Sequence, residues 1–521
     1  MSEESKRVGE IFKALASGVT WMETQGLPVH CPADGEIIAH LALDDKQSLA
    51  DKVNRAAAAQ RVLGSQKREE RAALVEKLSA EIKGSREWLG ELITLEAGKT
   101  PKEALAEADG ASDILLKTIK DASLAEFGGM LRCKERPPVG IVGLITSFNF
   151  PLVVANWTIA PALLAGNGVV WKPSEKTPLV ALAYKAVFDG AMGGVKDLLQ
   201  LVIGGREVGE ALVSHEAIDM ISATGSVQMG QGIKAALARK KNNNVKPILE
   251  LGGNNGIIIS EKMSADHLEW ALHSLLNSFL GTTGQRCTNT RRLIVQRGMM
   301  DKVVAILQKH IEAFLASAEM QNPLFEIVRL RQGFGETSRH SAFSATADGY
   351  GPLIDADAYQ RFERAKKRAL EEGGKILFGE RLLAAEHPNA YYVEPALAVM
   401  PAQTAVMHEE TFAPLLFIAP YNTLDEAIAL LNAPANAGLT NGIYTQSQAE
   451  ADRFASANQA GHGLINSAKG TGTPAFGMGF GGNKESGTGE ILNAADPLKP
   501  FTRDDHYRRI AQNKDIAMDW E

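Results

Sequence analysis

The stretch from Pro137 to Trp171 constrains the fold of this chain most, because it is largely apolar and contains no Asp, Glu, Lys or Arg. Its length alone would suit a transmembrane span. It also contains residues that would be costly in lipid, namely Asn149, Asn156, Asn167, Pro151 and Pro161. We therefore expect a buried strand, a loop, a buried helix and a second strand, as in the core of an α/β domain.

Short runs rich in strand-forming residues alternate with helix-like segments along most of the chain. After helices expected over 49–95, the first group of runs lies at 139–146, 169–171, 199–203, 220–222 and 248–251, with helices at 179–189 and 207–214. After Gly253 a second group begins, with runs at 256–260 and 293–296 around a helix at 268–279. Strands that alternate with helices form largely parallel sheets with right-handed crossovers, so the sequence predicts two α/β units.

Composition limits the partners and the compartment. The 521 residues correspond to roughly three domains' worth of chain. The net charge of −7 leaves no basic field for nucleic acid or for a membrane surface. Three cysteines, Cys31, Cys133 and Cys287, are too few for a disulfide framework and favour a reducing compartment. The N-terminal residues lack the apolar core of a secretory signal, so we expect a cytoplasmic protein.

Three residues are candidates for catalysis. Cys287 lies in Gly-Gln-Arg-Cys-Thr at 284–288, where a neighbouring cation favours a thiolate; an inert buried cysteine is the alternative. Glu250 ends an apolar strand and precedes two glycines, where a carboxylate serves as a general base or simply pairs with a lysine. Asn149 follows the run at 139–146, and its NH₂ group suits a developing oxyanion or satisfies the backbone of a loop.

Two further segments suit a nucleotide. Lys172 and Glu175 follow a strand and are placed to hydrogen-bond ribose hydroxyls. The segment from Gly225 to Gly230 predicts a turn from a strand into a helix, whose N-terminus suits a phosphate. No GxGxxG fingerprint of the usual kind lies at a strand–helix junction. The sequence also lacks a Cys and His cluster with metal-ligand spacing, so no metal is expected.

In their order along the chain, these segments resemble the NAD(P)-dependent aldehyde dehydrogenase superfamily from about residue 30 to about residue 490. The order continues after Cys287 with Glu-Thr-Phe-Ala-Pro at 410–414 and Phe-Gly-Gly-Asn-Lys-Glu-Ser-Gly at 480–487. The resemblance implies NAD-dependent oxidation of an aldehyde, with Cys287 as nucleophile, Glu250 as general base and Asn149 at the oxyanion. The residues that it implies for the cofactor are Lys172, Glu175, Gly225, Ser226, Gly230, Glu410 and Phe412, with Gly252 and Gly253 in a nearby turn.

The resemblance also implies the α/β aldehyde dehydrogenase fold. Its parts are a Rossmann-like NAD-binding domain (1–118 and 140–250), an α/β catalytic domain (251–475) and a small β oligomerisation element with a tail (119–139 and 476–521). A homodimer or homotetramer is expected. NAD is expected in preference to NADP, because the Glu175 carboxylate would repel a 2′-phosphate. The segment 320–351 is longer than the loop usual in the family, and the sequence after Glu490 diverges.

Within the superfamily the sequence is most similar to the α-aminoadipic semialdehyde dehydrogenase (antiquitin) group. The similarity rests on 284–288 followed by Arg291 and Arg292, and on Glu-Glu-Thr-Phe-Ala-Pro at 409–414, where most of the superfamily has Gly in place of Ala413. It implies that Arg286 binds a substrate carboxylate and Glu103 an α-amino group.

The alternative for Arg286 is a surface or intersubunit ion pair, and for Glu103 a solvated helix charge. Non-phosphorylating glyceraldehyde-3-phosphate dehydrogenases also carry Arg before the nucleophile, so a phosphorylated or an aliphatic aldehyde remains open. Two other classes also remain open: a catalytically silent NAD-binding protein, and a cysteine hydrolase that uses Cys287 with a histidine.

Overall fold

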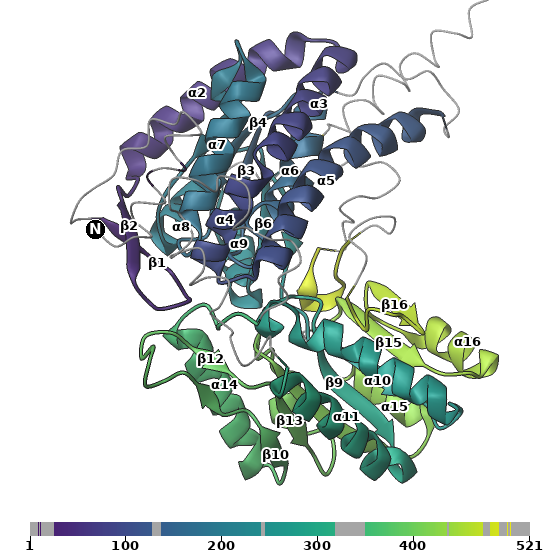
Figure 1. Cartoon of the computed structure of the whole chain (residues 1–521). Coiled ribbons are helices and arrows are strands. Elements are labelled where there is room, and N and C mark those ends of the chain that lie inside the picture. The colour runs from purple at the N-terminus through teal and green to yellow at the C-terminus, as the bar shows by residue number, and fades with distance from the viewer. Residues whose placement is uncertain are drawn as a thin grey trace, which may run out of the picture.

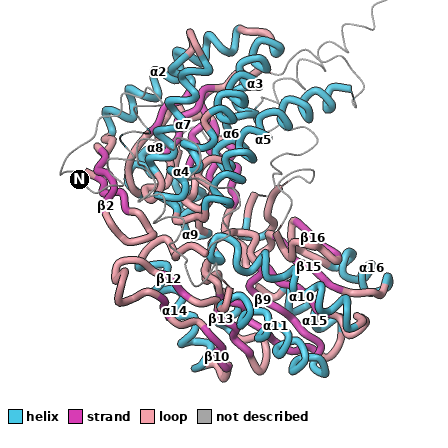
Figure 2. Tube along the Cα trace, viewed as in Figure 1, coloured by secondary structure: helices cyan, strands magenta, loops and turns pink. Residues whose placement is uncertain are grey.

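The computed structural model of the chain describes residues 9, 11, 26–127, 137–240, 245–317, 350–434, 437–472, 480–488, 498 and 501. Two sheets, each covered by helices, form two lobes (Figure 1). Figure 2 shows the strands of these sheets as two separate groups, one in each lobe. The predicted α/β class is therefore confirmed. The predicted segment 320–351 and the tail lie almost entirely outside the described residues.

The first sheet has the strand order β5-β4-β3-β6-β7, and every pair in it is parallel. This is the order of a mononucleotide-binding unit, in which the sequence order reverses beside the first strand. The strands are β3 (Ile141–Ile145), β4 (Gly168–Lys172), β5 (Leu199–Leu201), β6 (Met220–Thr224) and β7 (Lys246–Glu250). The helices between them are α6 (Val153–Leu164), α7 (Pro178–Met192), α8 (Arg206–Ser214) and α9 (Val227–Ala238).

Four N-terminal helices pack around this unit: α2 (Lys46–Ser65), α3 (Arg68–Gly84), α4 (Arg86–Ala97) and α5 (Pro101–Phe127). The helix α5 was not predicted, and it runs through the predicted domain boundary at 118/119. Its buried apolar residues recur at helical spacing, as at Ala111, Ile114, Leu115 and Ala122, and the part of the expected β element up to residue 127 is helical. A hairpin of β1 (Leu27–His30) and β2 (Ile37–Leu41) precedes α2.

The second sheet has the order β10-β13-β14-β9-β8-β15-β16, and only the edge strand β10 runs antiparallel to its neighbour. Its strands are β8 (Asn255–Ile259), β9 (Thr290–Gln296), β10 (Lys375–Phe378), β13 (Ala396–Val399), β14 (Leu415–Tyr421), β15 (Thr440–Tyr444) and β16 (His462–Ile465). Its helices are α10 (Ala265–Leu280), α11 (Met300–Leu315), α14 (Ala356–Glu371), α15 (Leu424–Asn432) and α16 (Gln448–Ala457). A short pair, β11 (Arg381–Leu382) and β12 (Tyr392–Val393), lies beside it in the same lobe.

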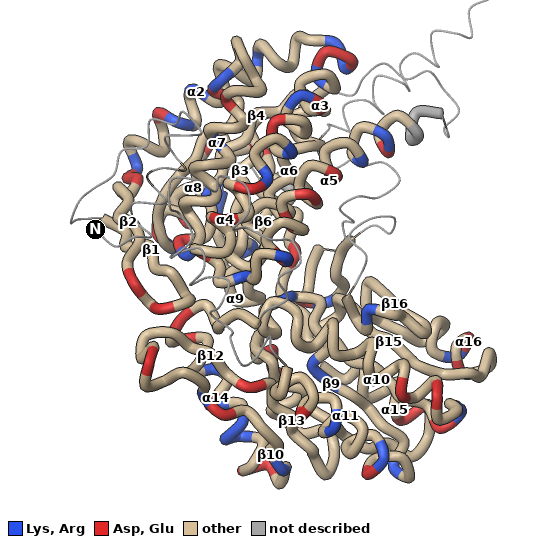
Figure 3. Tube along the Cα trace, in the orientation of Figure 1, with Lys and Arg blue, Asp and Glu red and all other residues tan. Residues whose placement is uncertain are grey.

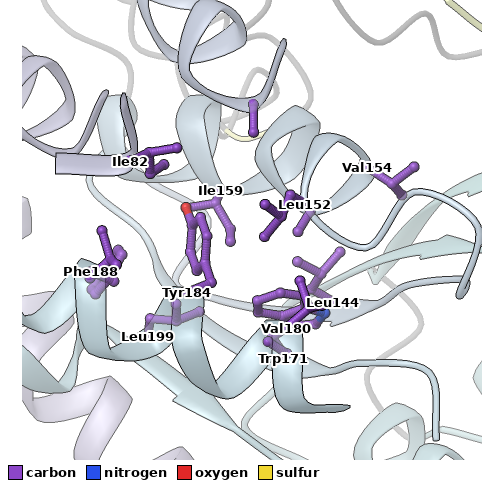
Figure 4. Packing of buried hydrophobic residues seen from close by; sticks show 14 of the residues in the cluster. Ile82, Leu144, Leu152, Val154, Ile159, Trp171, Val180, Tyr184, Phe188 and Leu199 are labelled. Carbon is purple, nitrogen blue, oxygen red and sulfur yellow. The ribbon is translucent and has the colours of Figure 1, made fainter. Parts of the chain in front are cut away.

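The charge-free stretch forms β3, α6 and β4, as the sequence predicts, and all three elements are buried. Its asparagines are hydrogen-bonded rather than solvated: Asn156 donates to the carbonyl of Ala111 in α5 and accepts from the hydroxyl of Tyr184. Trp171 packs edge-on against Tyr184 with ring centroids 5.6 Å apart (Figure 4). None of the described helices has the length and apolar content needed to cross a bilayer.

Acidic and basic residues are interspersed along the outer helices of both lobes (Figure 3). The buried strands carry few of them, and Lys172, Glu250, Arg291 and Arg292 are exceptions. All four lie near the ends of strands where the two sheets meet. Since a buried charge is costly unless it is paired or used, these residues direct attention to this junction.

Candidate active site

The two sheets are joined end to end by the four residues from Leu251 to Asn254, which connect β7 to β8. The carboxyl edge of the first sheet therefore faces the amino edge of the second. Close contacts surround both glycines in this connection, and at Gly253 the contact is with backbone, which leaves no room for a Cβ. A Cβ on Gly252 would lie 1.9 Å from Oε2 of Glu410, and one on Gly253 would lie 2.5 Å from the carbonyl oxygen of Cys287. The predicted nucleophile and a predicted cofactor residue thus meet at one turn.

Cys287 lies between the short helix η2 (Gly281–Gly284) and β9, at the amino edge of the second sheet, and is partly buried. The amide Nδ2 of Asn255 donates to the carbonyls of Cys287 (2.8 Å) and Asn289 (2.7 Å) and so fixes the loop. Burial raises the pKa of the Cys287 thiol to about 12, and the carboxylates of Glu410 and Glu250 add to this effect. In the protein without ligands the thiol is therefore protonated at neutral pH.

Glu250 is the last residue of β7 and is 3% exposed. Neither of its carboxylate oxygens accepts a hydrogen bond of ordinary length and angle from a described residue, and the backbone N–H of Gly482 lowers its pKa by less than burial raises it. Burial raises its pKa well above the usual value for a carboxyl group. A buried and unpaired carboxylate is costly, and this state suits a group that accepts a proton during a reaction. The alternative of a structural pair with a lysine is not observed in the described part of the chain.

Asn149 follows β3 and is buried in the loop before α6. Its Nδ2 donates to the carbonyl of Gln285 (2.8 Å), two residues before Cys287, and its Oδ1 accepts from the hydroxyl of Ser147 (2.8 Å). These two bonds set the orientation of the amide, since the serine hydroxyl must meet the oxygen side. No hydrogen bond to a described residue engages the second N–H of the amide. The structure thus brings Asn149 to the cysteine loop from the other lobe.

A cavity of about 290 Å³ lies at the carboxyl edge of the first sheet. Lys172 and Glu175 line it and pair with each other (Nζ–Oε2 3.0 Å). Burial opposes ionisation of Glu175, but Lys172, a backbone N–H and Lys176 together outweigh burial and lower its pKa, so the carboxylate is charged. An ionised Glu beside a Lys offers both an acceptor and a donor to a ribose diol. The cavity therefore fits the adenosine end of a dinucleotide.

Ser226 also lines this cavity and caps the N-terminus of α9, where its hydroxyl accepts from the N–H of Met229 (3.1 Å). The helix end carries a partial positive charge and free N–H groups that suit a phosphate. Glycines permit the close packing, because a Cβ on Gly225 would lie 2.7 Å from Met229 and one on Gly230 would lie 2.4 Å from Leu251. The predicted residues of this turn are thus together at one site that fits NAD.

Glu410 and Phe412 lie on the other side of the Gly252–Gly253 turn. Oε1 of Glu410 accepts from the N–H of Gly253 (3.1 Å) and pairs with Arg291 (3.1 Å). Phe412 has a φ of +54° and meets Phe148 edge-on, with ring centroids 6.0 Å apart. A positive φ at a bulky residue is uncommon and is found where surrounding structure enforces it. The strained backbone presents the ring toward the loop that carries Asn149.

Arg286 and Glu103 are bound to each other (Nη2–Oε1 2.8 Å). Glu103 also accepts from the N–H of Thr282 (2.7 Å), and Nε of Arg286 donates to the Thr282 hydroxyl (2.9 Å). Glu103 is therefore not a solvated helix charge, which corrects that alternative. The pair was not predicted, because each residue was expected to bind the substrate by itself. Among the described residues, no hydrogen bond engages Nη1 of Arg286.

Several residues of the site were missed from the sequence. Asn255 holds the cysteine loop, and Gln285 links it to 350–354 through the carbonyl of Pro352 and the N–H of Ile354. The sequence offered only a weak indication of their roles. Asn255 is a polar amide close to the predicted Gly252–Gly253 turn, and Gln285 is a polar amide close to the predicted nucleophile. Among the described residues no group of His, Cys, Asp or Glu is arranged to hold a metal ion.

Comparisons with known proteins match nearly the whole chain. A model described as the aldehyde dehydrogenase family matches residues 21–505. α-Aminoadipic semialdehyde dehydrogenase from Bos taurus is 29% identical over 492 residues, which cover 92% of this chain and 84% of that protein. N-succinylglutamate 5-semialdehyde dehydrogenase 1 from Caulobacter vibrioides is 34% identical over 439 residues, which cover 82% of this chain and 85% of that protein. A solved structure of betaine aldehyde dehydrogenase from Staphylococcus aureus in complex with NAD+ has a TM-score of 0.79 at 25% identity, with 96% of each chain covered.

Proposed function

Because the chain belongs to the aldehyde dehydrogenase family, we propose that it oxidises an acidic semialdehyde, in particular α-aminoadipic semialdehyde, to the carboxylate. The family, the α/β fold and the cofactor predicted from the sequence are confirmed, and the protein is an NAD-dependent aldehyde dehydrogenase. The silent-protein and hydrolase alternatives are therefore set aside. The roles of individual residues and the identity of the aldehyde are parts of the proposal.

In the first half of the reaction the Cys287 sulfur attacks the aldehyde carbon and forms a thiohemiacetal. The thiol proton is released to solvent water as the sulfur attacks, so that Glu250 remains a free base for the second half of the reaction. The second N–H of Asn149 and the backbone N–H of Cys287 stabilise the oxyanion, a contribution of about 3–4 kcal/mol in comparable sites. NAD, when bound, supplies the hydride acceptor. Lys172, Glu175 and Ser226 hold its adenosine and pyrophosphate, and Glu410 and Phe412 its nicotinamide ribose and ring.

In the second half a water molecule hydrolyses the thioester. Glu250 takes a proton from the water as the C–O bond forms. The C–S bond then breaks, which releases the carboxylate product and regenerates the Cys287 thiol. The observation that carries this assignment is the buried carboxyl of Glu250, which has no ion-pair partner among the described residues and lies at the junction where Cys287 also lies.

The Arg286–Glu103 pair supports an α-amino acid as the head group of the substrate. The guanidinium is already balanced by a carboxylate, so a simple anion would gain little from it. A zwitterionic head group is complementary to the pair, because its carboxylate can bind the Nη1 group and its ammonium the Glu103 carboxylate. Charged hydrogen bonds of this kind contribute roughly 1.5–3 kcal/mol each. The similarity to α-aminoadipic semialdehyde dehydrogenase favours the same head group.

The proposal is tested with a panel of aldehydes, read as NADH formed. The expected order of kcat/KM is α-aminoadipic semialdehyde above a semialdehyde without the amino group, and both above hexanal. Arg286→Ala should lower kcat/KM for the amino acid semialdehyde by about 10- to 150-fold, which corresponds to the 1.5–3 kcal/mol above. It should barely affect hexanal. Equal losses on both substrates would show that Arg286 serves the fold or Cys287 instead.

A second specificity follows from the relative in Caulobacter vibrioides, whose N-succinylglutamate semialdehyde substrate has an acylated amino group. This compound belongs in the same panel, because Glu103 has no ammonium to bind in it. Glu103→Gln would then leave its oxidation unchanged while it weakens that of the amino acid. A cytoplasmic homodimer or homotetramer and the predicted domain roles complete the proposal, and light scattering after size-exclusion chromatography measures the oligomeric state.

A further inference from the structure

Arg291 forms a bracket around the loop of the predicted nucleophile, that is, hydrogen bonds to one residue on each side of Cys287. It is the second residue of β9 and is 1% exposed. Its Nη2 donates to the carbonyl of Arg286 (2.8 Å), and its Nη1 donates to the carbonyl of Asn289 (3.0 Å). The two carbonyls belong to residues on either side of Cys287. A single planar group with several donors in a fixed geometry therefore holds both ends of the cysteine turn.

The same guanidinium also holds the segment predicted to contact the nicotinamide end of the cofactor. Nη2 lies 3.1 Å from Oε1 of Glu410, and the guanidinium carbon lies 5.5 Å from the centre of the Phe412 ring. Glu410 is in turn held by the N–H of Gly253. Arg291 is thus in contact with the cysteine loop and with 410–412 at once, although these segments are far apart in the sequence.

The charge of Arg291 acts on the sulfur as well. Burial and the two nearby carboxylates hinder ionisation of Cys287, whereas the positive charge of Arg291 favours it. The side chain is fully buried, so its charge is little screened by solvent. Arg291 is therefore placed to stabilise a thiolate as it forms, in addition to fixing the loop.

We propose that Arg291 is a positioning residue that locks the Cys287 loop and the Glu410–Phe412 segment at one separation, so that the sulfur and the hydride acceptor are aligned. This inference rests on the roles proposed above for Cys287, Glu410 and Phe412. Arg291 entered the sequence analysis only as a feature of the subgroup. Misplacement of a reacting group by about 1 Å costs on the order of 100-fold in rate, so a lost bracket should be visible in the hydride-transfer step.

The test compares Arg291→Met, which removes both charge and bracket, with Arg291→Lys, which keeps the charge but cannot reach the carbonyls and Glu410 together. Arg71→Met is the matched control, because Arg71 is also a buried arginine that donates to two carbonyls, those of Leu164 and Gln66, away from this site. Single-turnover NADH formation from propanal and from the proposed substrate measures the hydride step. Iodoacetamide alkylation of Cys287 without cofactor, located by peptide mass spectrometry, measures the thiol.

Arg291→Met should slow single-turnover hydride transfer by about 10- to 100-fold and shift the pH dependence of alkylation to higher pH. If the thiol pKa rises by about one unit, the thiolate fraction falls tenfold, and its greater nucleophilicity returns about threefold, which leaves alkylation about threefold slower. Arg291→Lys should restore the alkylation profile but not the hydride-transfer rate. Arg71→Met should lower the unfolding temperature and change neither readout.

Two outcomes would overturn the inference. If Arg291→Met changes the two readouts no more than Arg71→Met does, Arg291 has only a structural role. If Arg291→Lys restores both readouts, charge alone matters and the bracket does not. Failure of the proposed substrate is distinguishable, because propanal oxidation and alkylation of Cys287 do not depend on the head group. Labelling that is confined to cysteines other than Cys287 would instead refute the assignment of the nucleophile.

Discussion

The replacement Glu250→Gln separates the two halves of the proposed reaction. It removes the carboxylate that is proposed to take a proton from water, while it keeps the size of the side chain. Hydride transfer precedes hydrolysis of the thioester, so the variant should still form about one equivalent of NADH per active site in a burst. Its steady-state rate should fall by about 10²- to 10⁴-fold, the usual contribution of a general base.

The raised pKa of Glu250 gives this prediction a pH dependence. The base must be deprotonated, so the steady-state rate of the wild type should rise with pH through a value well above that of an ordinary carboxyl group. The same group affects stability. Between its unfolded and folded pKa values the folded state holds more protons, so the contribution of Glu250 to the free energy of unfolding falls as pH rises. Glu250→Gln should therefore gain stability relative to the wild type as pH rises, because the amide does not ionise.

Rapid mixing with NAD and aldehyde gives the burst and the steady-state rate in one trace, and thermal unfolding at several pH values gives the stability. Glu96→Gln is the matched control. Glu96 is equally buried and its pKa is also raised by burial, but its oxygens accept from the N–H groups of Leu179 (2.6 Å) and Val180 (2.8 Å) at the start of α7. Its replacement should lower stability and leave the ratio of burst to steady state unchanged.

Two results would refute the reasoning on Glu250. A variant without a burst would place the carboxylate at an earlier step, such as removal of the proton from Cys287. A variant with a normal steady-state rate would show that another group activates the water.

Three further predictions concern the same site. Cys287→Ala should abolish aldehyde oxidation and leave the dissociation constant for NAD, measured by calorimetry, nearly unchanged, whereas near-normal turnover would exclude Cys287 as the nucleophile. The ratio of kcat/KM for NAD to kcat/KM for NADP should exceed one in the wild type. It should fall toward one in Glu175→Gln, which loses the charge that repels a 2′-phosphate. A wild-type preference for NADP would contradict this prediction. Gly253→Ala should fold but lose about tenfold or more in kcat, because its Cβ would displace the Cys287 carbonyl from a 2.5 Å approach; unchanged kcat would show that the loop adapts.

Much of the first lobe could be predicted from the sequence, because local patterns determine it. The charge-free stretch and the alternating runs predicted β3, α6, β4 and their neighbours, since burial on both faces of a parallel strand excludes charge. The turn at Ser226 was also predictable, as its serine and glycines are adjacent in the chain. The long helix α5 was missed because the domain boundary at 118/119 was taken from the resemblance, and the periodicity of the residues around it was not considered.

The contacts across the junction could not be predicted from local patterns. Arg286 and Glu103 are 183 residues apart in the sequence, and nothing near either residue indicates that they pair. Cys287 lies at the amino edge of its sheet, whereas the general rule for α/β proteins points to carboxyl edges. That rule led to Glu250, which ends β7 at the junction, and gave no information on the cysteine. The bracket formed by Arg291 likewise depends on how two distant segments pack.

The burial of β3, α6 and β4 also has a consequence for how the chain folds. Strand β3 pairs in parallel with both β4 and β6, so its partners must be brought together across crossovers before it is covered. Until then 35 consecutive residues without a charge are exposed to other chains, with no acidic or basic side chain to discourage association. Slow, non-local pairing lengthens this exposure. We therefore expect the yield of refolding to fall as protein concentration rises, and a chaperone that shields apolar segments to restore it.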